Sequence, residues 1–240
     1  KDNAQASKLL EAVLKEVPYH PQAHGLLGTL AQQRGDLQRC LAHYMIVAHF
    51  FPEREAVQMA IAGLYGRLGQ FDQAVKPLEA AALAVAKTGI REPLPNQHQH
   101  DLLELGLINL QQGEPRALDA VIDIFSHRNP GLSQAISEGR KIPPATTPDA
   151  VLNVCRAVVA FEPEHEHFAS DYASWLVAYG RIDEAKEILN TTLERHPTVW
   201  RAWGMLSDLA AADQDPDRAA GYLQKAIDHS PIAEQIYPFL

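Results

Sequence analysis

Apolar residues recur three and four positions apart through most of this chain, and the apolar runs end at prolines. Such a spacing predicts amphipathic helices, and a proline ends each helix because it has no backbone N–H. The prolines that follow these runs are Pro18, Pro52, Pro130, Pro163, Pro197 and Pro231. Successive prolines in this set are 34, 78, 33, 34 and 34 residues apart. The long interval equals two periods of 34 residues plus ten, so a proline expected near Ala86 is missing. The pattern therefore predicts an internal repeat of 34 residues.

Each interval between these prolines is expected to contain two helices. A glycine stands where the first helix of four intervals must stop, at Gly35, Gly69, Gly113 and Gly180. Glycine readily takes the left-handed conformation that closes a helix. Small residues stand early in the second helix, at Ala6, Ala74, Ala185 and Ala219. A larger side chain there would hold the two helices apart, so each interval predicts a tight helical hairpin.

The repeated elements resemble the tetratricopeptide repeat, whose signature is W-x2-L-G-x2-Y, then A-x3-F, then P. The second interval contains Leu27-Gly28, Gly35-Asp36, Cys40, Tyr44 and Pro52, and the last contains Trp203, Leu206, Ala210, Ala219, Leu223 and Ala226. The resemblance covers nearly the whole chain, although no single repeat matches fully. It implies an all-α fold, a tetratricopeptide-like right-handed superhelix of antiparallel helix hairpins, or α-solenoid. One hairpin cannot bury its own apolar face, so neighbouring hairpins must stack.

The repeat pattern divides the chain into six parts. We expect repeats over residues 1–86 (the first with only its second helix), an inserted loop over 87–98, a repeat over 99–130, a degraded repeat over 131–163, two repeats over 164–231, and the start of a further helix or a tail over 232–240. The inserted loop is interpreted as a tolerated surface insertion, with a contribution to binding as the alternative. In the degraded repeat we expect a short first helix near Leu132–Glu138 and a next helix capped by Thr147.

Charge and composition narrow the class of partner. The formal net charge is −9, and an acidic chain lacks the surplus of lysine and arginine that phosphate backbones require. No apolar run reaches the ~18 residues of a membrane span. We therefore expect no nucleic-acid partner and no membrane insertion. No compartment is specified by the sequence, although the cytoplasm is favoured over the periplasm.

Residues with possible chemistry have simpler interpretations. His98 with His100, and His165 with His167, form H-x-H pairs, but an i, i+2 pair on a helix points to different faces. We interpret these histidines as solvated and expect no metal site. Cys40 and Cys155 occupy apolar helix positions and are expected in the core, while Asp119 and Asp123 are expected on a solvated face. No nucleophile elbow, phosphate loop or dinucleotide fingerprint is present, so we expect no catalytic residue and no cofactor.

The resemblance implies a concave groove lined by the first helix of each hairpin. Its predicted partner-contacting residues are Gln22, Leu26, Thr29, Gln33, Met59, Gly63, Arg67, His100, Leu103, Leu107 and Gln111. Several are apolar or small, which suits an apolar peptide or an amphipathic helix. The alternative for each is packing between neighbouring first helices.

The sequence thus predicts a non-catalytic protein–protein interaction module or scaffold that binds a peptide or partner helix in the concave groove. One alternative is the targeting arm of a larger multidomain enzyme of glycosyltransferase, sulfotransferase or hydroxylase type. This alternative is motivated by the abrupt ends, which lack an evident polar capping helix. A further alternative is a self-assembling scaffold, in which the partner is a second copy of the chain.

Overall fold

The computed structural model describes residues 2–144 and 146–230, and this part of the chain contains thirteen α-helices and no strand. The chain divides into two compact units, Lys1–Pro130 and Gly131–Leu240, which we call the N-terminal and C-terminal units. The residues expected to begin a further helix or a tail, 232–240, lie outside the described residues. In the described part, no helix has both the length and the apolar character needed to cross a membrane.

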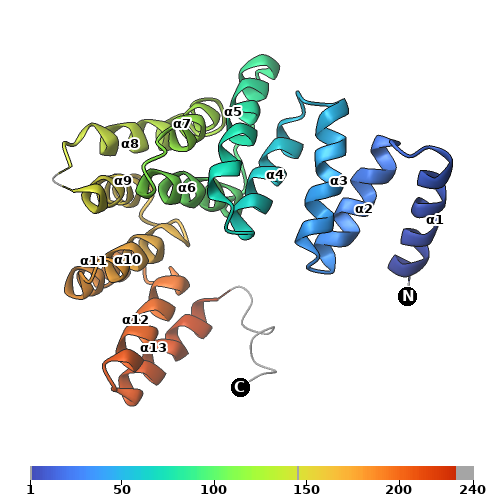
Figure 1. Ribbon diagram of the computed structural model, residues 1–240. Helices are drawn as coiled ribbons and strands as arrows, with labels where there is room; N and C mark the ends of the chain where they lie inside the picture. The colour runs from blue at the N-terminus through green and yellow to red at the C-terminus, as the bar shows by residue number, and fades with distance from the viewer. Residues whose placement is uncertain (1, 145, 231–240) are drawn as a thin grey trace. The chain divides into compact units, whose positions relative to one another are not determined.

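The N-terminal unit contains seven helices (Figure 1). They are α1 (Asp2–Glu16), α2 (Pro21–Gln33), α3 (Leu37–Phe50), α4 (Glu55–Arg67), α5 (Phe71–Thr88), α6 (Asn96–Gln111) and α7 (Arg116–Arg128). Helix α2 packs against α3, α4 against α5 and α6 against α7, and each of these hairpins also packs against the next, most extensively where α7 contacts α5. This arrangement is the stack of hairpins that the repeat pattern predicts.

The C-terminal unit contains the remaining six helices. They are α8 (Pro130–Lys141), α9 (Thr147–Phe161), α10 (Phe168–Ala178), α11 (Ile182–Arg195), α12 (Trp200–Ala212) and α13 (Pro216–His229). Here α10 pairs with α11 and α12 with α13, and α9 packs against α10. At twelve residues, α8 is longer than the short helix expected near Leu132–Glu138, because Leu132 and Ile136 form a fully buried apolar face.

The glycines between paired helices adopt the conformation that their positions predict. Their φ angles are positive at Gly35 (74°), Gly69 (70°), Gly113 (85°) and Gly180 (74°), where a side chain would be strained. Ala74 and Ala185 are fully buried near the start of the second helix of their hairpins. Ala6 and Ala219, predicted for the same role, are only half-buried. The glycines thus confirm where the hairpins turn, and the close helix approach is confirmed at Ala74 and Ala185.

No proline ends the helix near Ala86, because α5 continues past this position. Helix α5 continues through this position to Thr88 and ends at Gly89, whose φ is 66°. The connection that follows is held against the unit. Leu94 is buried, Gln99 Nε2 donates to its carbonyl at 2.7 Å, and Arg128 Nη1 donates to the Glu92 carbonyl at 2.8 Å.

A buried ion pair joins the second and third hairpins of the N-terminal unit. Arg128 at the end of α7 donates through Nη2 to Glu55 Oε2 at 2.7 Å and through Nε to Glu55 Oε1 at 3.1 Å. The two side chains are only 11% and 5% exposed. The same guanidinium also binds the Glu92 carbonyl. Arg128 therefore connects α4, α7 and the connection between α5 and α6.

One helix start differs from the expectation. Helix α9 is capped by Thr146, whose hydroxyl accepts from Asp149 N at 3.4 Å and donates to Asp149 Oδ2 at 2.9 Å. Thr147, the expected cap, is the first residue of the helix. Two adjacent threonines precede Pro148, and either one has the hydroxyl that capping requires. The sequence alone therefore predicted the cap one residue too late.

Candidate partner-binding groove

A hollow of about 330 Å³ lies in the N-terminal unit, mainly between α4 and α6. It is lined by Gln32, Tyr44, Ala56, Met59, Ala60, Gly63, Leu64, Arg67, His98, Asp101, Leu102 and Leu105. A second hollow of about 350 Å³ shares Gly63, Arg67, Asp101 and Leu105 with the first and adds Gly66, Phe71, Glu104 and Ile108. Because the two hollows share these residues, we treat them as one surface and call it the α4–α6 groove.

The wall from α4 is made of residues at helical spacing. The residues are three and four positions apart, so they occupy one face of the helix. They are Ala56, Met59, Ala60, Gly63 and Arg67. Most of these side chains are small. A Cβ atom added to Gly63 would meet no atom within 4 Å. The absence of a side chain at Gly63 therefore leaves open space in the middle of the groove.

The rim of the groove is polar. The Tyr44 hydroxyl donates to Gln32 Oε1 at 3.5 Å and lies 3.4 Å from Thr29 Oγ1. On the α6 side, Asp101 Oδ1 accepts from Gln97 Nε2 at 2.7 Å. Arg67 is exposed and lines both hollows. An apolar floor inside a polar rim is the arrangement found at protein-binding surfaces.

The structure places the predicted groove residues unevenly. Met59, Gly63 and Arg67 line the groove, and Thr29 contacts its rim through Tyr44. Four further residues, Gln22, Leu26, Gln33 and Gln111, are exposed but do not line it. The side chain of His100 is 15% exposed and lies 3.5 Å from Glu104 Oε2.

The prediction for α6 needs a correction. Leu103 and Leu107 are buried, at 5% and 2% exposure, so neither presents a side chain to a partner. The residues of α6 that line the groove are His98, Asp101, Leu102, Glu104, Leu105 and Ile108, which lie on either side of the predicted positions. One residue corresponds to ~100° around a helix. Ten extra residues lie before α6, so the 34-residue spacing that predicts the facing residues of the other first helices does not hold for α6.

Several residues of the groove were not predicted from the sequence. Tyr44 belongs to the second helix α3, and Leu102 and His98 lie on α6 beside the predicted positions. The sequence did contain an indication of Tyr44, because it lies four residues, or one helical turn, after the buried Cys40. The close approach of α2 and α3 at Gly28, where an added Cβ would lie 2.6 Å from the Tyr44 ring, directs that ring toward the rim.

Of the four histidines expected to be solvated, His165 and His167 are buried and His100 is only 15% exposed. His165 and His167 are 6% and 4% exposed, and the His165 ring stacks on Phe168 with centroids 3.6 Å apart. The interpretation as solvated histidines is therefore wrong for this pair, because the connection before α10 folds inward. His98 is exposed, as expected, and so are Asp119 and Asp123.

Both cysteines are buried, which confirms their expected place in the core. Cys40 is 0% and Cys155 4% exposed, and both are free thiols. Burial raises the pKa of each thiol, most strongly at Cys155, where the nearby Asp171 carboxylate adds to the effect. A thiol with a raised pKa holds little of the thiolate form that acts as a nucleophile.

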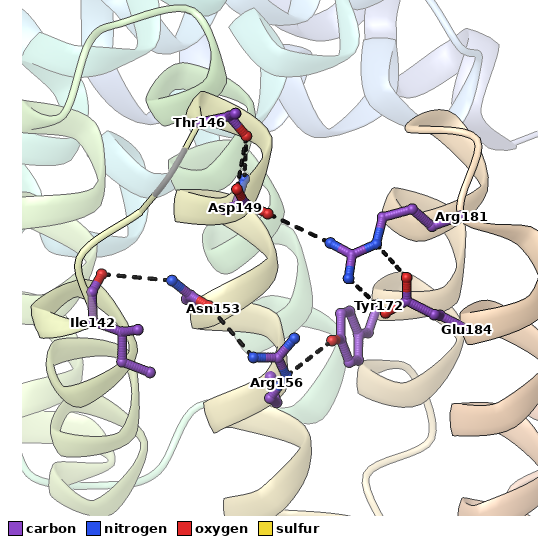
Figure 2. A network of polar contacts seen from close by, with 8 residues as sticks. All are labelled: Ile142, Thr146, Asp149, Asn153, Arg156, Tyr172, Arg181 and Glu184. Carbon is purple, nitrogen blue, oxygen red and sulfur yellow. Dashed lines mark hydrogen bonds and ion pairs between the residues drawn. The ribbon is translucent and has the colours of Figure 1, made fainter.

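A polar network joins α9, α10 and α11 in the C-terminal unit (Figure 2). Arg181 Nη1 lies 3.5 Å from Asp149 Oδ1, and Arg181 Nε donates to Glu184 Oε1 at 2.6 Å. Arg156 Nε donates to the Tyr172 hydroxyl at 3.3 Å. The hydrogen bond with Glu184 raises the pKa of Arg181 and lowers that of Glu184. The network is a set of paired charges, which fits a role in positioning these helices.

Comparison with known proteins gives matches at the level of fold. Residues 176–234 match the family model of the tetratricopeptide repeat, and no curated protein matches the chain. A tetratricopeptide repeat protein from Parabacteroides merdae ATCC 43184 has a TM-score of 0.54 at 19% identity, over 99% of this chain and 90% of that one. A Podosopora anserina putative kinesin light chain with nearly identical TPR-like repeats has a TM-score of 0.47 at 20% identity, over 91% of this chain and 98% of that one.

The Parabacteroides structure and the family match support the same assignment. The structural likeness extends over nearly all of the chain, and the family match covers α11 and the hairpin formed by α12 and α13. These findings agree with the stacked hairpins and the glycine turns described above. The chain is thus a tetratricopeptide-repeat α-solenoid by fold, and its residues 176–234 match the tetratricopeptide repeat family model.

Proposed function

We propose that this chain is a non-catalytic protein-interaction module that holds an extended peptide or a partner helix in the α4–α6 groove. The observation that carries the proposal is the open, apolar floor at Met59, Ala60 and Gly63, bounded by the charged side chains of Arg67 and Asp101. Stacked hairpins commonly use such concave surfaces for binding.

The chemistry of the groove supports binding over a reaction. Its polar side chains are the amide of Gln32 on α2, the phenol of Tyr44 on α3, the guanidinium of Arg67 on α4, and the imidazole of His98 with the carboxylates of Asp101 and Glu104 on α6. The nucleophilic thiols Cys40 and Cys155 are buried and lie outside its lining. Covalent catalysis requires an activated nucleophile beside a base and an orienting group, and the groove lining contains no cysteine or serine. A peptide needs only an apolar contact and a few polar partners.

The dimensions also favour a peptide segment. Two adjoining hollows of about 330 and 350 Å³ are each large enough for one or two side chains. Their shared residues lie along α4 and α6, so an occupant would extend across both. An apolar side chain would occupy the space over Gly63, while the polar rim would bind the main chain on either side.

The test is a binding measurement with matched variants. Peptides selected from a random display library on the full chain would be titrated against Met59→Glu and against Met45→Glu. Met45 lies on α3, is 50% exposed and lines a different hollow, so it controls for adding a charge. We expect Met59→Glu to weaken binding by tenfold or more, which corresponds to ~1.4 kcal/mol, while Met45→Glu binds normally and both variants keep full helicity.

Two results would contradict the proposal. Equal affinity of wild type and Met59→Glu would show that the peptides bind elsewhere, and equal loss in both variants would show a nonspecific charge effect. Light scattering of the chain alone across a concentration series distinguishes the self-assembly alternative. A mass that rises with concentration and falls in Met59→Glu would identify a second copy as the occupant of the groove.

A further inference from the structure

Two histidines of the first complete hairpin are hydrogen-bonded to each other. His24 on α2 and His43 on α3 place their Nδ1 atoms 2.8 Å apart, with ring centroids separated by 5.1 Å. His24 is 5% exposed. The two helices are in close contact one turn further on, where a Cβ added to Gly28 would lie 2.6 Å from the Tyr44 ring. The packing of α2 on α3 therefore keeps the two rings together.

The neighbouring groups determine where the protons lie. His24 Nε2 is 2.9 Å from the carbonyl oxygen of Pro18. A carbonyl only accepts, so His24 must carry its proton on Nε2, and its neutral ring then has an acceptor at Nδ1. His43 must in turn donate from Nδ1 to that acceptor. The neutral His43 ring is left with an unprotonated Nε2, for which the described residues provide no hydrogen-bond partner.

This chain of donors and acceptors limits how many protons the pair accepts. A first proton binds at His43 Nε2 and leaves both hydrogen bonds intact. A second proton must bind at His24 Nδ1, where it would face the His43 N–H across 2.8 Å. We propose that His24 and His43 form a proton-sensitive joint that tolerates one added proton and opens with the second, releasing α2 from α3 and from the connection after α1.

The charged groups around the joint come from all three helices packed there. Glu11 and Lys15 lie on α1, Arg34 follows α2, and Asp36 and Arg39 belong to the start of α3, all lining one hollow of about 370 Å³ with His43. Arg39 pairs with Asp36 at 3.6 Å, and Arg34 Nη2 donates to Ser7 Oγ at 2.8 Å. Burial, then His24 and Arg39, lower the pKa of His43, and Glu11 opposes them.

Opening of the joint would affect a defined part of the chain. The Pro18 carbonyl belongs to the connection between α1 and α2, so loss of its bond to His24 loosens that connection as well as the α2–α3 contact. The hydrogen bonds of the joint involve α2, α3 and this connection, whereas the Glu55–Arg128 pair holds α4 and α7 together separately. Acid should therefore expose the amides of residues 18–47 before those of residues 55–128.

Nitrogen-15 NMR of the labelled full chain tests the tautomers directly. At pH 8 we expect His24 as the Nε2–H form and His43 as the Nδ1–H form. As the pH falls, His43 should become doubly protonated while His24 keeps its form. A His24 that carries its proton on Nδ1 at pH 8 would overturn the proposal, as would a second proton on His24 with unchanged amide protection over residues 18–47.

Hydrogen exchange of the same chain tests the opening. Because opening takes up one proton, exchange over residues 18–47, normalised to an unstructured peptide, should rise about tenfold for each pH unit below the first protonation. His43→Gln removes one of the two rings and should abolish this rise, whereas His49→Gln, on the exposed face of α3, should keep it. A rise that persists in His43→Gln, or that extends equally to residues 55–128, would refute the joint.

Discussion

The close packing of α8 on α9 makes Gly139 intolerant of any side chain. An added Cβ would lie 2.7 Å from Val154 Cα and 2.8 Å from the Asn153 carbonyl oxygen. Both are backbone atoms, so no rotation of a side chain relieves the contact. Ordinary contacts begin near 3.4 Å, and Gly139→Ala therefore requires the helices to separate by 0.7 Å, the difference between 3.4 and 2.7 Å.

The matched control is Gly204→Ala in α12 of the same unit, where an added Cβ would meet nothing within 4 Å. Alanine in a helix interior is favoured over glycine by ~1 kcal/mol, so this variant should be stabilised by that amount. Overpacking costs ~1–3 kcal/mol. The free energy of unfolding of Gly139→Ala should consequently be lower than that of Gly204→Ala by at least ~1 kcal/mol.

The assay is urea unfolding followed by tryptophan fluorescence. The chain has three tryptophans, Trp175, Trp200 and Trp203, and all belong to the C-terminal unit, so the signal reports the unit that contains both glycines. The variants should differ in midpoint with similar m-values. Equal stabilisation of both variants would refute the close approach of α8 and α9.

Four other predictions follow from individual contacts. Glu55→Ala should lower the unfolding free energy by ~3–5 kcal/mol, because it leaves Arg128 charged and buried; a loss below ~1 kcal/mol in circular-dichroism unfolding would contradict this. The pKa of His43 is lowered from 6.5 in the folded chain, so the unfolded chain binds the proton more tightly. The urea midpoint of unfolding should therefore fall as the pH drops below 6.5. A midpoint that stays constant from pH 8 to pH 5 would contradict the lowered pKa. Cys40 and Cys155 should resist a thiol reagent in the folded chain and react after unfolding, whereas rapid reaction of native protein would show that they are accessible. Gly63→Leu should leave helicity intact and abolish peptide binding, because the new side chain fills the groove; undiminished affinity would locate the site elsewhere.

Much of the fold could be predicted because its information is local. The prolines and the glycines at 35, 69, 113 and 180 mark helix ends through backbone conformation alone, and the structure has turns at each of these glycines. The small residues Ala74 and Ala185 likewise indicate a close helix pair from their position in the repeat. The division of the chain into the particular repeats proposed from the sequence stays a prediction.

The groove was predicted less well because it depends on the rotation of each helix. Met59, Gly63 and Arg67 on α4, where the period is regular, line the groove, and their contact with a partner stays a prediction. Leu103 and Leu107 on α6 are buried next to residues that line it. Helix α6 is apolar on more than one face, so periodicity cannot select the accessible face. The Glu55–Arg128 pair was not predictable either, since its partners are 73 residues apart and no local pattern connects them.

Site-specific photocrosslinking tests the proposed groove most directly. A photoreactive phenylalanine would replace Ala60 in the groove or, as a control, Met45 on α3, and each full-length variant would be irradiated with a selected peptide. Binding in the groove predicts efficient crosslinking from position 60, its suppression by excess unlabelled peptide, and little crosslinking from position 45. Equal crosslinking from both positions, or crosslinking from position 45 alone, would contradict the groove as the site of binding.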